Sequence, residues 1–295
     1  MKSESSASSV QLELQSSVIA DAWATLQAHA TQGHPLEKDA QRLAFADPEF
    51  LTRRETRGLR FQLELLKPEL GQADAGIQHT VVVFGGARFR PPEMADQILK
   101  DAQASGNASA LAAARILVRN AHYCVDARRF GQLVGRHSLD SPEPDRMFIC
   151  TGGGPGVMEA ANQGAHDVGA LSVGLNIALP HEQHPNAYVS PGLCFKFHYF
   201  ALRKMHFMMR AKALVAFPGG FGTLDELFEV LTLVQCGKAE RVPIFLYGSD
   251  YWKRVLHFDV LVEEGAIAPE DVQLFEYVDD PEVTWNRIKA FYQLP

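Results

Sequence analysis

The 295-residue sequence has little of several features that define common classes of protein. It has only four cysteines and no C-x-x-C pair, so neither a disulfide framework nor a zinc site is expected. No apolar run approaches the ~18 residues that a membrane-spanning helix needs. The first residues, MKSESSASS, lack the apolar stretch of a signal peptide. These absences together predict a cytoplasmic protein with reduced thiols and no membrane contact.

The sequence also lacks the basic charge that nucleic-acid-binding proteins carry. Lysine and arginine together number 28, against 35 aspartates and glutamates, and the net charge is −7. Nucleic-acid recognition normally requires a clustered excess of basic residues, so no nucleic-acid partner is expected. A small anionic ligand could still be held at one local site.

Three regions are predicted from the pattern of residue types. Residues 1–15 are rich in serine and are predicted to be disordered. Residues 16–75 form a predicted N-terminal helical arm, in which Leu59, Leu63 and Leu66 recur at helical spacing and Pro68 is expected to end the run. The arm is expected to pack on the main domain or on a neighbouring subunit. Residues 76–295 are predicted to form the main domain.

In the main domain, short strand-like runs alternate with helical ones. Strands are predicted at residues 79–84, 146–151, 171–175, 213–217 and 242–247. Helices are predicted near residues 108–137, 156–168, 197–211, 223–236, 250–263 and 281–292. This alternation predicts an α/β fold: a doubly wound, Rossmann-like parallel sheet with helices on both faces.

Three of the predicted strands run directly into glycine-rich loops. The loops are GGAR at 85–88, GGGPG at 152–156 and PGGFGT at 218–223. In a doubly wound sheet, ligands bind outside the carboxyl ends of the strands. Glycine lets backbone N–H groups approach a ligand, and the following helix N-terminus suits a phosphate. One such loop would fit a tight turn equally well, but three in corresponding positions favour a ligand crevice.

Two familiar nucleotide fingerprints are missing from these loops. Neither GGGPGV nor PGGFGT completes G-x-G-x-x-G, and no Walker A loop is present, so a dinucleotide cofactor is not expected.

The spacing of Thr223 and Glu226 fits a capping box, with Thr223 as the N-cap. Alternatively, Glu226 projects into the crevice. The place of Glu159 in the first turn of a helix is explained by the helix dipole alone.

Three segments of the sequence resemble the Lonely Guy (LOG) family of phosphoribohydrolases. They are GGGPGVMEAAN (152–162), LRKM (202–205) and PGGFGTLDE (218–226), and the match in register extends over about residues 79–293. Members of this family release the base from nucleoside 5′-monophosphates and were formerly labelled lysine decarboxylases. The resemblance implies that Arg203 and Glu226 are the catalytic pair. The substrate-binding residues that it implies are Gly85, Gly86, Arg88, Gly153, Gly154, Glu159, Lys204, Gly219, Gly220, Phe221, Gly222 and Thr223.

The resemblance also implies that no metal or organic cofactor is needed, and that the protein is a homodimer or a higher homo-oligomer. The sequence departs from the short plant-type members in GVMEAAN, in FGGAR and in its long N-terminal arm, and it looks more like a longer bacterial subgroup. Two other functions are alternatives. The same loops would serve a non-enzymatic nucleotide or molybdenum-cofactor carrier, whereas a pyridoxal-phosphate decarboxylase needs a lysine beside the loops, and none is there.

Overall fold

The computed structural model describes residues 44–179 and 184–295. The chain divides into two compact units, residues 1–63 and 64–295. The predicted disordered tail, and the part of the predicted helical arm before residue 44, lie outside the described residues. Within the described ranges, no helix is both long and apolar enough to cross a membrane.

The described part of the first unit consists of short helical segments. They are η1 (Ala44–Ala46), α2 (Pro48–Thr52) and the beginning of α3 (Arg57–Asp74). Asp47 caps α2, because its carboxylate accepts hydrogen bonds from the backbone N–H groups of Glu49 and Phe50 at 3.0 and 3.2 Å. The guanidinium of Arg60 donates to backbone oxygens at the end of α2.

The prediction that Pro68 ends the arm helix was wrong, because α3 continues through it to Asp74. In the second unit, contacts before and after the proline hold this part of α3. Glu64 accepts hydrogen bonds from the backbone N–H groups of His198 and Tyr199. Glu69 pairs with Arg210 at 2.7 Å. These tertiary contacts outweigh the backbone hydrogen bond that a proline removes.

The second unit is built on a seven-stranded sheet whose neighbouring strands all pair in parallel. Its order is β4-β3-β2-β1-β5-β6-β7, which confirms the predicted doubly wound fold. Two strands were not predicted, β4 and β7, and both lie at the edges of the sheet. The strands are β1 (Thr80–Phe84), β2 (Phe148–Thr151), β3 (Ser172–Ile177), β4 (Cys194–Phe197), β5 (Ala211–Ala216), β6 (Ile244–Tyr247) and β7 (Glu276–Val278).

The helices of this unit agree with most of the predicted ranges. Two predicted helices are each in fact two, α5 with α6 and α10 with α11, and the helix before α5, α4, was not predicted. Their bounds are α4 (Pro92–Ser105), α5 (Ala108–Asn120), α6 (His122–Asp140), α7 (Val157–Asp167), α8 (Phe200–Met209), α9 (Phe221–Gln235), α10 (Ser249–Val255), α11 (Phe258–Glu263) and α12 (Pro281–Tyr292), with 3-10 turns η2 (Glu143–Asp145) and η3 (Pro269–Gln273).

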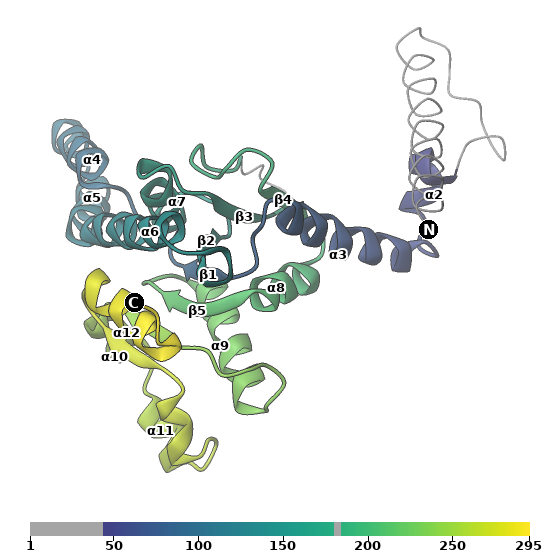
Figure 1. Cartoon of the computed structure of the whole chain (residues 1–295). Helices are drawn as coiled ribbons and strands as arrows, with labels where there is room; N and C mark the ends of the chain where they lie inside the picture. Colours follow the sequence, from purple (N-terminus) through teal and green to yellow (C-terminus); the bar gives the residue numbers. More distant parts are fainter. Residues whose placement is uncertain (1–43, 180–183) are drawn as a thin grey trace, which may run out of the picture. The chain divides into compact units, whose positions relative to one another are not determined.

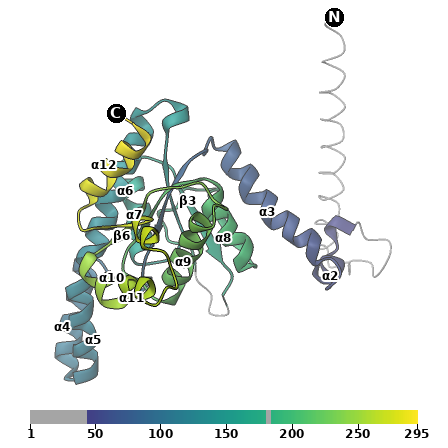
Figure 2. The ribbon, with the colours of Figure 1, turned by 90° about the horizontal axis from the view of Figure 1, so that it is seen from below.

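Helices cover both faces of the sheet (Figures 1 and 2). Side chains alternate between the faces along each strand. In β1, Val81 and Val83 pack with α6, α7 and α12, whereas Val82 and Phe84 pack with α8 and α9. Because both faces are buried, the central strands are apolar almost throughout, as the sequence pattern predicted.

Glycines bring α6 and α7 unusually close together. A Cβ atom on Gly131 would lie 2.2 Å from the carbonyl oxygen of Ala161, and one on Gly164 would lie 2.0 Å from that of Arg128. Neither contact is possible for a larger residue without movement of a helix backbone. Helix α7 begins directly after the second glycine loop, so this packing fixes the position of that loop.

Candidate functional site

The three glycine loops follow three neighbouring strands of the sheet. Strands β2, β1 and β5 are adjacent, and the loops leave their carboxyl ends. From β1 the chain builds outward through β2, β3 and β4 on one side, and through β5, β6 and β7 on the other. The order of the strands therefore reverses between β1 and β5, which is where doubly wound sheets bind their ligands.

Direct contacts join the three loops. The N–H of Gly86 donates to the carbonyl of Pro218 at 2.9 Å, and the N–H of Val157 donates to the carbonyl of Gly86 at 3.3 Å. Gly156 has a φ of +75°, and a Cβ atom there would lie 2.4 Å from the oxygen of Gly86. Gly85 is also packed tightly, since a Cβ atom would lie 2.6 Å from the side chain of Val157. Gly85, Gly86 and Gly156 thus bring the loops together.

A buried polar network holds the second loop. The Thr151 hydroxyl donates to the Asn162 side-chain oxygen at 2.7 Å and accepts from the N–H of Gly153 at 2.9 Å. The Asn186 amide donates to the carbonyl of Gly154 at 3.1 Å and to Asn162 at 3.0 Å. Thr151, Asn162 and Asn186 were not predicted as site residues, because only the fold brings them together. They fix a loop whose Gly153 has a φ of +67°.

The third loop ends in an uncapped helix N-terminus. Helix α9 begins at Phe221 with Gly220 as its N-cap, and no side chain caps it. A Cβ atom on Gly220 or Gly222 would have no neighbour within 4 Å, so packing does not require glycine at either position. The first N–H groups of a helix lack partners within the helix, and together with the helix dipole they suit an anion. The loop is therefore open to a phosphate.

The capping-box prediction for Thr223 and Glu226 was wrong. The helix begins two residues before Thr223, so Thr223 lies inside its first turn and is buried. Its hydroxyl oxygen lies 2.1 Å from the point where a Cβ atom on Gly219 would be, which explains the glycine there. Without the capping role, the Glu226 carboxylate is available for another partner.

That partner is Arg203, on α8. Its Nη1 lies 3.2 Å from Oε1 of Glu226, and the two side chains are only 10% and 12% exposed. The Nε of Arg203 donates to the carbonyl of Leu175 on β3 at 2.8 Å. Nη2 lies 2.6 Å from where a Cβ atom on Gly152 would be, so the glycine leaves room for the guanidinium. A buried ion pair thus stands beside the second loop.

Burial raises the pKa of Glu226 to about 7, although the positive charge of Arg203 opposes the shift. A carboxyl group in this range gains and loses a proton near neutral pH, as a general acid or base must. Strongly shifted groups in a cleft are often functional. The pair therefore combines a tunable carboxylate with a fixed positive charge.

Four other predicted site residues occupy different surroundings. Arg88 is exposed at the end of the first loop, and Glu159 is half-buried in the first turn of α7. Phe221 is 91% exposed at the beginning of α9. Lys204 pairs with carboxylates of α9 instead of the glycine loops. Its ammonium group lies 2.7 Å from Asp225 and 3.1 Å from Glu229.

The carboxylates around Lys204 affect its protonation. Desolvation by burial lowers its pKa, but hydrogen bonds from the ammonium group to Asp225 and Glu229 outweigh this and raise the pKa above the ordinary value. A lysine that forms a Schiff base must lose its proton, and the raised pKa of Lys204 opposes that loss. In the described parts of the chain, no group of three histidine, cysteine, aspartate or glutamate side chains is arranged to hold a metal ion.

Fold and site together define a Rossmann-like α/β protein with a glycine-lined crevice and a buried carboxylate–guanidinium pair. A family described as "possible lysine decarboxylase" matches residues 158–288. Cytokinin riboside 5′-monophosphate phosphoribohydrolase LOG3 of Arabidopsis thaliana is 34% identical over 126 residues, which cover 41% of this chain and 57% of the relative. The relative LOGL5 of Oryza sativa subsp. japonica, named as a probable enzyme of the same kind, is 30% identical over 155 residues, or 51% of this chain and 58% of its own.

These matches confirm the resemblance to the Lonely Guy family over part of the chain. The aligned stretches span less than three fifths of the length of the curated relatives. A molybdenum-cofactor-binding protein from Rippkaea orientalis matches with a TM-score of 0.46 and 18% identity, over 73% of this chain and 98% of that one.

Proposed function

We propose that the protein hydrolyses the N-glycosidic bond of a nucleoside 5′-monophosphate. The substrate would be AMP or a cytokinin riboside monophosphate, and the products the free base and ribose 5-phosphate. The relatives named as phosphoribohydrolases support this reaction class. The observation that carries the proposal is the buried pair of Arg203 and Glu226 beside the glycine loops.

A buried ion pair of this kind is poorly explained by stability. Removing two charges from water costs several kcal/mol, roughly, and apolar residues of similar volume are often as stabilising. The pair also stands at the carboxyl ends of β2 and β3, beside Gly152, where a doubly wound fold binds ligands. A role in binding and chemistry accounts for both its cost and its position.

The phosphate would bind at the N-terminus of α9. There Gly220 and Gly222 leave the backbone open, and the N–H groups of the first turn face the anion. Binding energy from this remote group can hold the sugar in a reactive geometry. The sugar would then extend toward Glu226, which lies on the second turn of the same helix.

Cleavage breaks the bond between C1′ and the base nitrogen, and positive charge develops on the ribose. The Glu226 carboxylate would stabilise that charge and take a proton from the attacking water, whose oxygen bonds to C1′. The leaving base would accept the electron pair of the broken bond and a proton from solvent, and Glu226 would return the proton of the attacking water to solvent. Arg203 would hold Glu226 in place and bind either the phosphate or the leaving base.

A subunit neighbour at this site stays a prediction. Three large apolar side chains on α8 are about half exposed: Phe200 (52%), Met205 (48%) and Met209 (48%). This exposed apolar surface supports the proposal that the protein is a homo-oligomer.

Release of adenine from AMP tests the proposed reaction. The wild-type protein is expected to release adenine from AMP and much less from adenosine, which lacks the phosphate. Glu226→Gln should lower the rate by about 10²–10⁴ while AMP still binds. The matched control is Glu229→Gln, the same change on the same helix at a residue that pairs with Lys204, and it should keep the wild-type rate.

Two results of this assay would contradict the proposal. Full turnover by Glu226→Gln would remove the assigned role of the carboxylate. Binding of AMP by the wild-type protein with no release of base would indicate a carrier instead of an enzyme. A wider panel of GMP, CMP, UMP and isopentenyl-AMP would identify the preferred base.

A further inference from the structure

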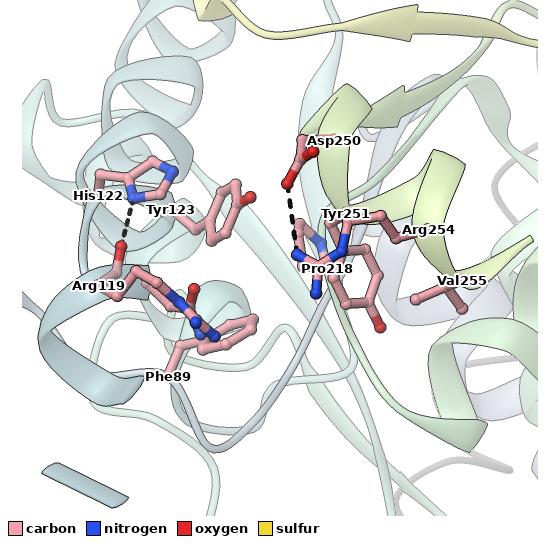
Figure 3. A pocket seen from close by; sticks show the side chains of 10 residues that line it. Phe89, Arg119, His122, Tyr123, Pro218, Asp250, Tyr251, Arg254 and Val255 are labelled. Carbon is pink, nitrogen blue, oxygen red and sulfur yellow. Dashed lines mark hydrogen bonds and ion pairs between the residues drawn. The ribbon is translucent and has the colours of Figure 1, made fainter. Parts of the chain in front are cut away.

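A second cavity lies beside the third glycine loop, apart from the ion pair. Its volume is about 490 Å³. One of its walls is α10, which follows β6, whereas Arg203 contacts β3 on the other side of the sheet's centre. Residues of α10 face residues from the junction of α5 and α6 across it (Figure 3). Its lining includes Phe89, Arg119, Tyr123, Pro218, Tyr251 and Arg254.

The walls of this cavity are rich in aromatic rings. The rings of Phe89 and Tyr123 lie 5.8 Å apart on one wall. Tyr251 stands on the other wall, and its hydroxyl donates to the carbonyl of Gly219. Gly248 has a φ of +86°, and a Cβ atom there would lie 2.9 Å from the Tyr123 ring, so the ring is packed against the end of β6. Such surfaces bind planar rings.

The charged groups at this cavity have an excess of positive charge. Arg119 and Arg254 line opposite walls, and Asp250 is the one acidic residue in the lining. Arg254 pairs with Asp250 at 3.4 Å, whereas Arg119 has no ion pair with any of the described residues. In a protein of net charge −7, two guanidinium groups around one hollow favour an anion.

We propose that this cavity is a second binding site, for a nucleotide whose planar ring lies against the aromatic walls and whose phosphate is held by Arg119 and Arg254. The volume is in the range of small-molecule sites, which is about 300–1,000 Å³. The Tyr251 contact with Gly219 connects the cavity to the proposed phosphate loop. An occupant would therefore contact the support of that loop without contacting Glu226. The inference does not depend on hydrolysis.

Calorimetric titration with AMP tests this site. The protein used is the full chain carrying Glu226→Gln, so that the nucleotide is not consumed. We expect two AMP sites per chain. Arg254→Glu should weaken one of them about ten-fold or more, the effect of losing a charge-assisted hydrogen bond. The matched control is Lys253→Glu on the same helix, whose ammonium lies over the ring of Tyr277, outside the cavity. It should leave both sites unchanged.

Two further probes separate the parts of the ligand. Ribose 5-phosphate has no planar ring and should bind at one site only, and that binding should be insensitive to Arg254→Glu. Adenosine has no phosphate, and Arg254→Glu should not weaken its binding.

Each combination of results bears on one of the two proposals. A single AMP site that is insensitive to Arg254→Glu would overturn this inference and leave the proposed function standing. A site that is sensitive to Arg254→Glu, in a wild-type protein that releases no adenine, would support this inference and overturn the proposed function. Failure of AMP to bind at all would overturn both.

Discussion

The stability of the protein should depend on pH through Glu226. Its pKa in the folded protein, about 7, lies above the ordinary value of 4.5. The folded state therefore holds a proton that the unfolded state has already lost between these values. The stability that this group contributes is full below about pH 4.5 and is lost as the pH rises through 7.

The size of the effect follows from the difference between the two pKa values. At about 1.4 kcal/mol per pH unit, the difference between 4.5 and about 7 amounts to about 3 kcal/mol at most. The Glu226 side chain is only 12% exposed, so solvent screens this cost weakly. Between pH 5 and pH 8, the wild-type protein should lose roughly 2 to 3 kcal/mol of stability relative to Glu226→Gln.

Urea denaturation at a series of pH values measures this difference directly. The variant Glu229→Gln controls for the removal of a carboxylate from the same helix. If the difference in the free energy of unfolding between wild type and Glu226→Gln does not change with pH, or grows as the pH rises, the carboxyl group is not destabilised by burial. The proposed protonation behaviour of the site would then be wrong.

Three further results are expected. Because the proposed mechanism uses the carboxylate, kcat/KM for AMP should rise with pH through about 7, and a profile that falls over this range would contradict it. Gly164→Ala should cost about 1–3 kcal/mol in urea denaturation, since its Cβ would lie 2.0 Å from a backbone oxygen of α6; a change below about 0.5 kcal/mol would contradict the close packing. Gly220→Ala should leave the free energy of unfolding within about 0.5 kcal/mol of wild type, because a Cβ atom there meets open space. The same variant should bind ribose 5-phosphate more weakly in calorimetry, and unchanged binding would contradict the placement of the phosphate at this loop.

The central sheet could be predicted because its sequence signal is local. Runs such as TVVVF in β1 are buried at every position and apolar after Thr80, since both faces of the strand are covered. The edge strand β4 has no such run: Lys196 is exposed between the buried Phe195 and Phe197, and the pattern is weak over four residues. β7 has only three residues, of which one is buried. Short edge strands carry little periodicity to read.

The candidate site was predictable in part, through its glycine loops. Glycine clusters after strands indicate a crevice, and the residues of the three loops do meet there. The spacing of Thr223 and Glu226 favoured a capping box, because spacing alone does not show where a helix begins. The partner of Glu226 is 23 residues away on another helix, and only the packing of α8 against β3 places Arg203 beside it. The α5–α6 wall of the second cavity could not be predicted from the sequence either.

The most direct test of the account is a crystal structure of Glu226→Gln with AMP bound. The phosphate should lie within hydrogen-bonding distance of the backbone N–H groups of residues 220–223, with C1′ of the ribose facing the side chain at position 226. A phosphate bound away from this loop, or a side chain at position 226 turned away from the sugar, would contradict it.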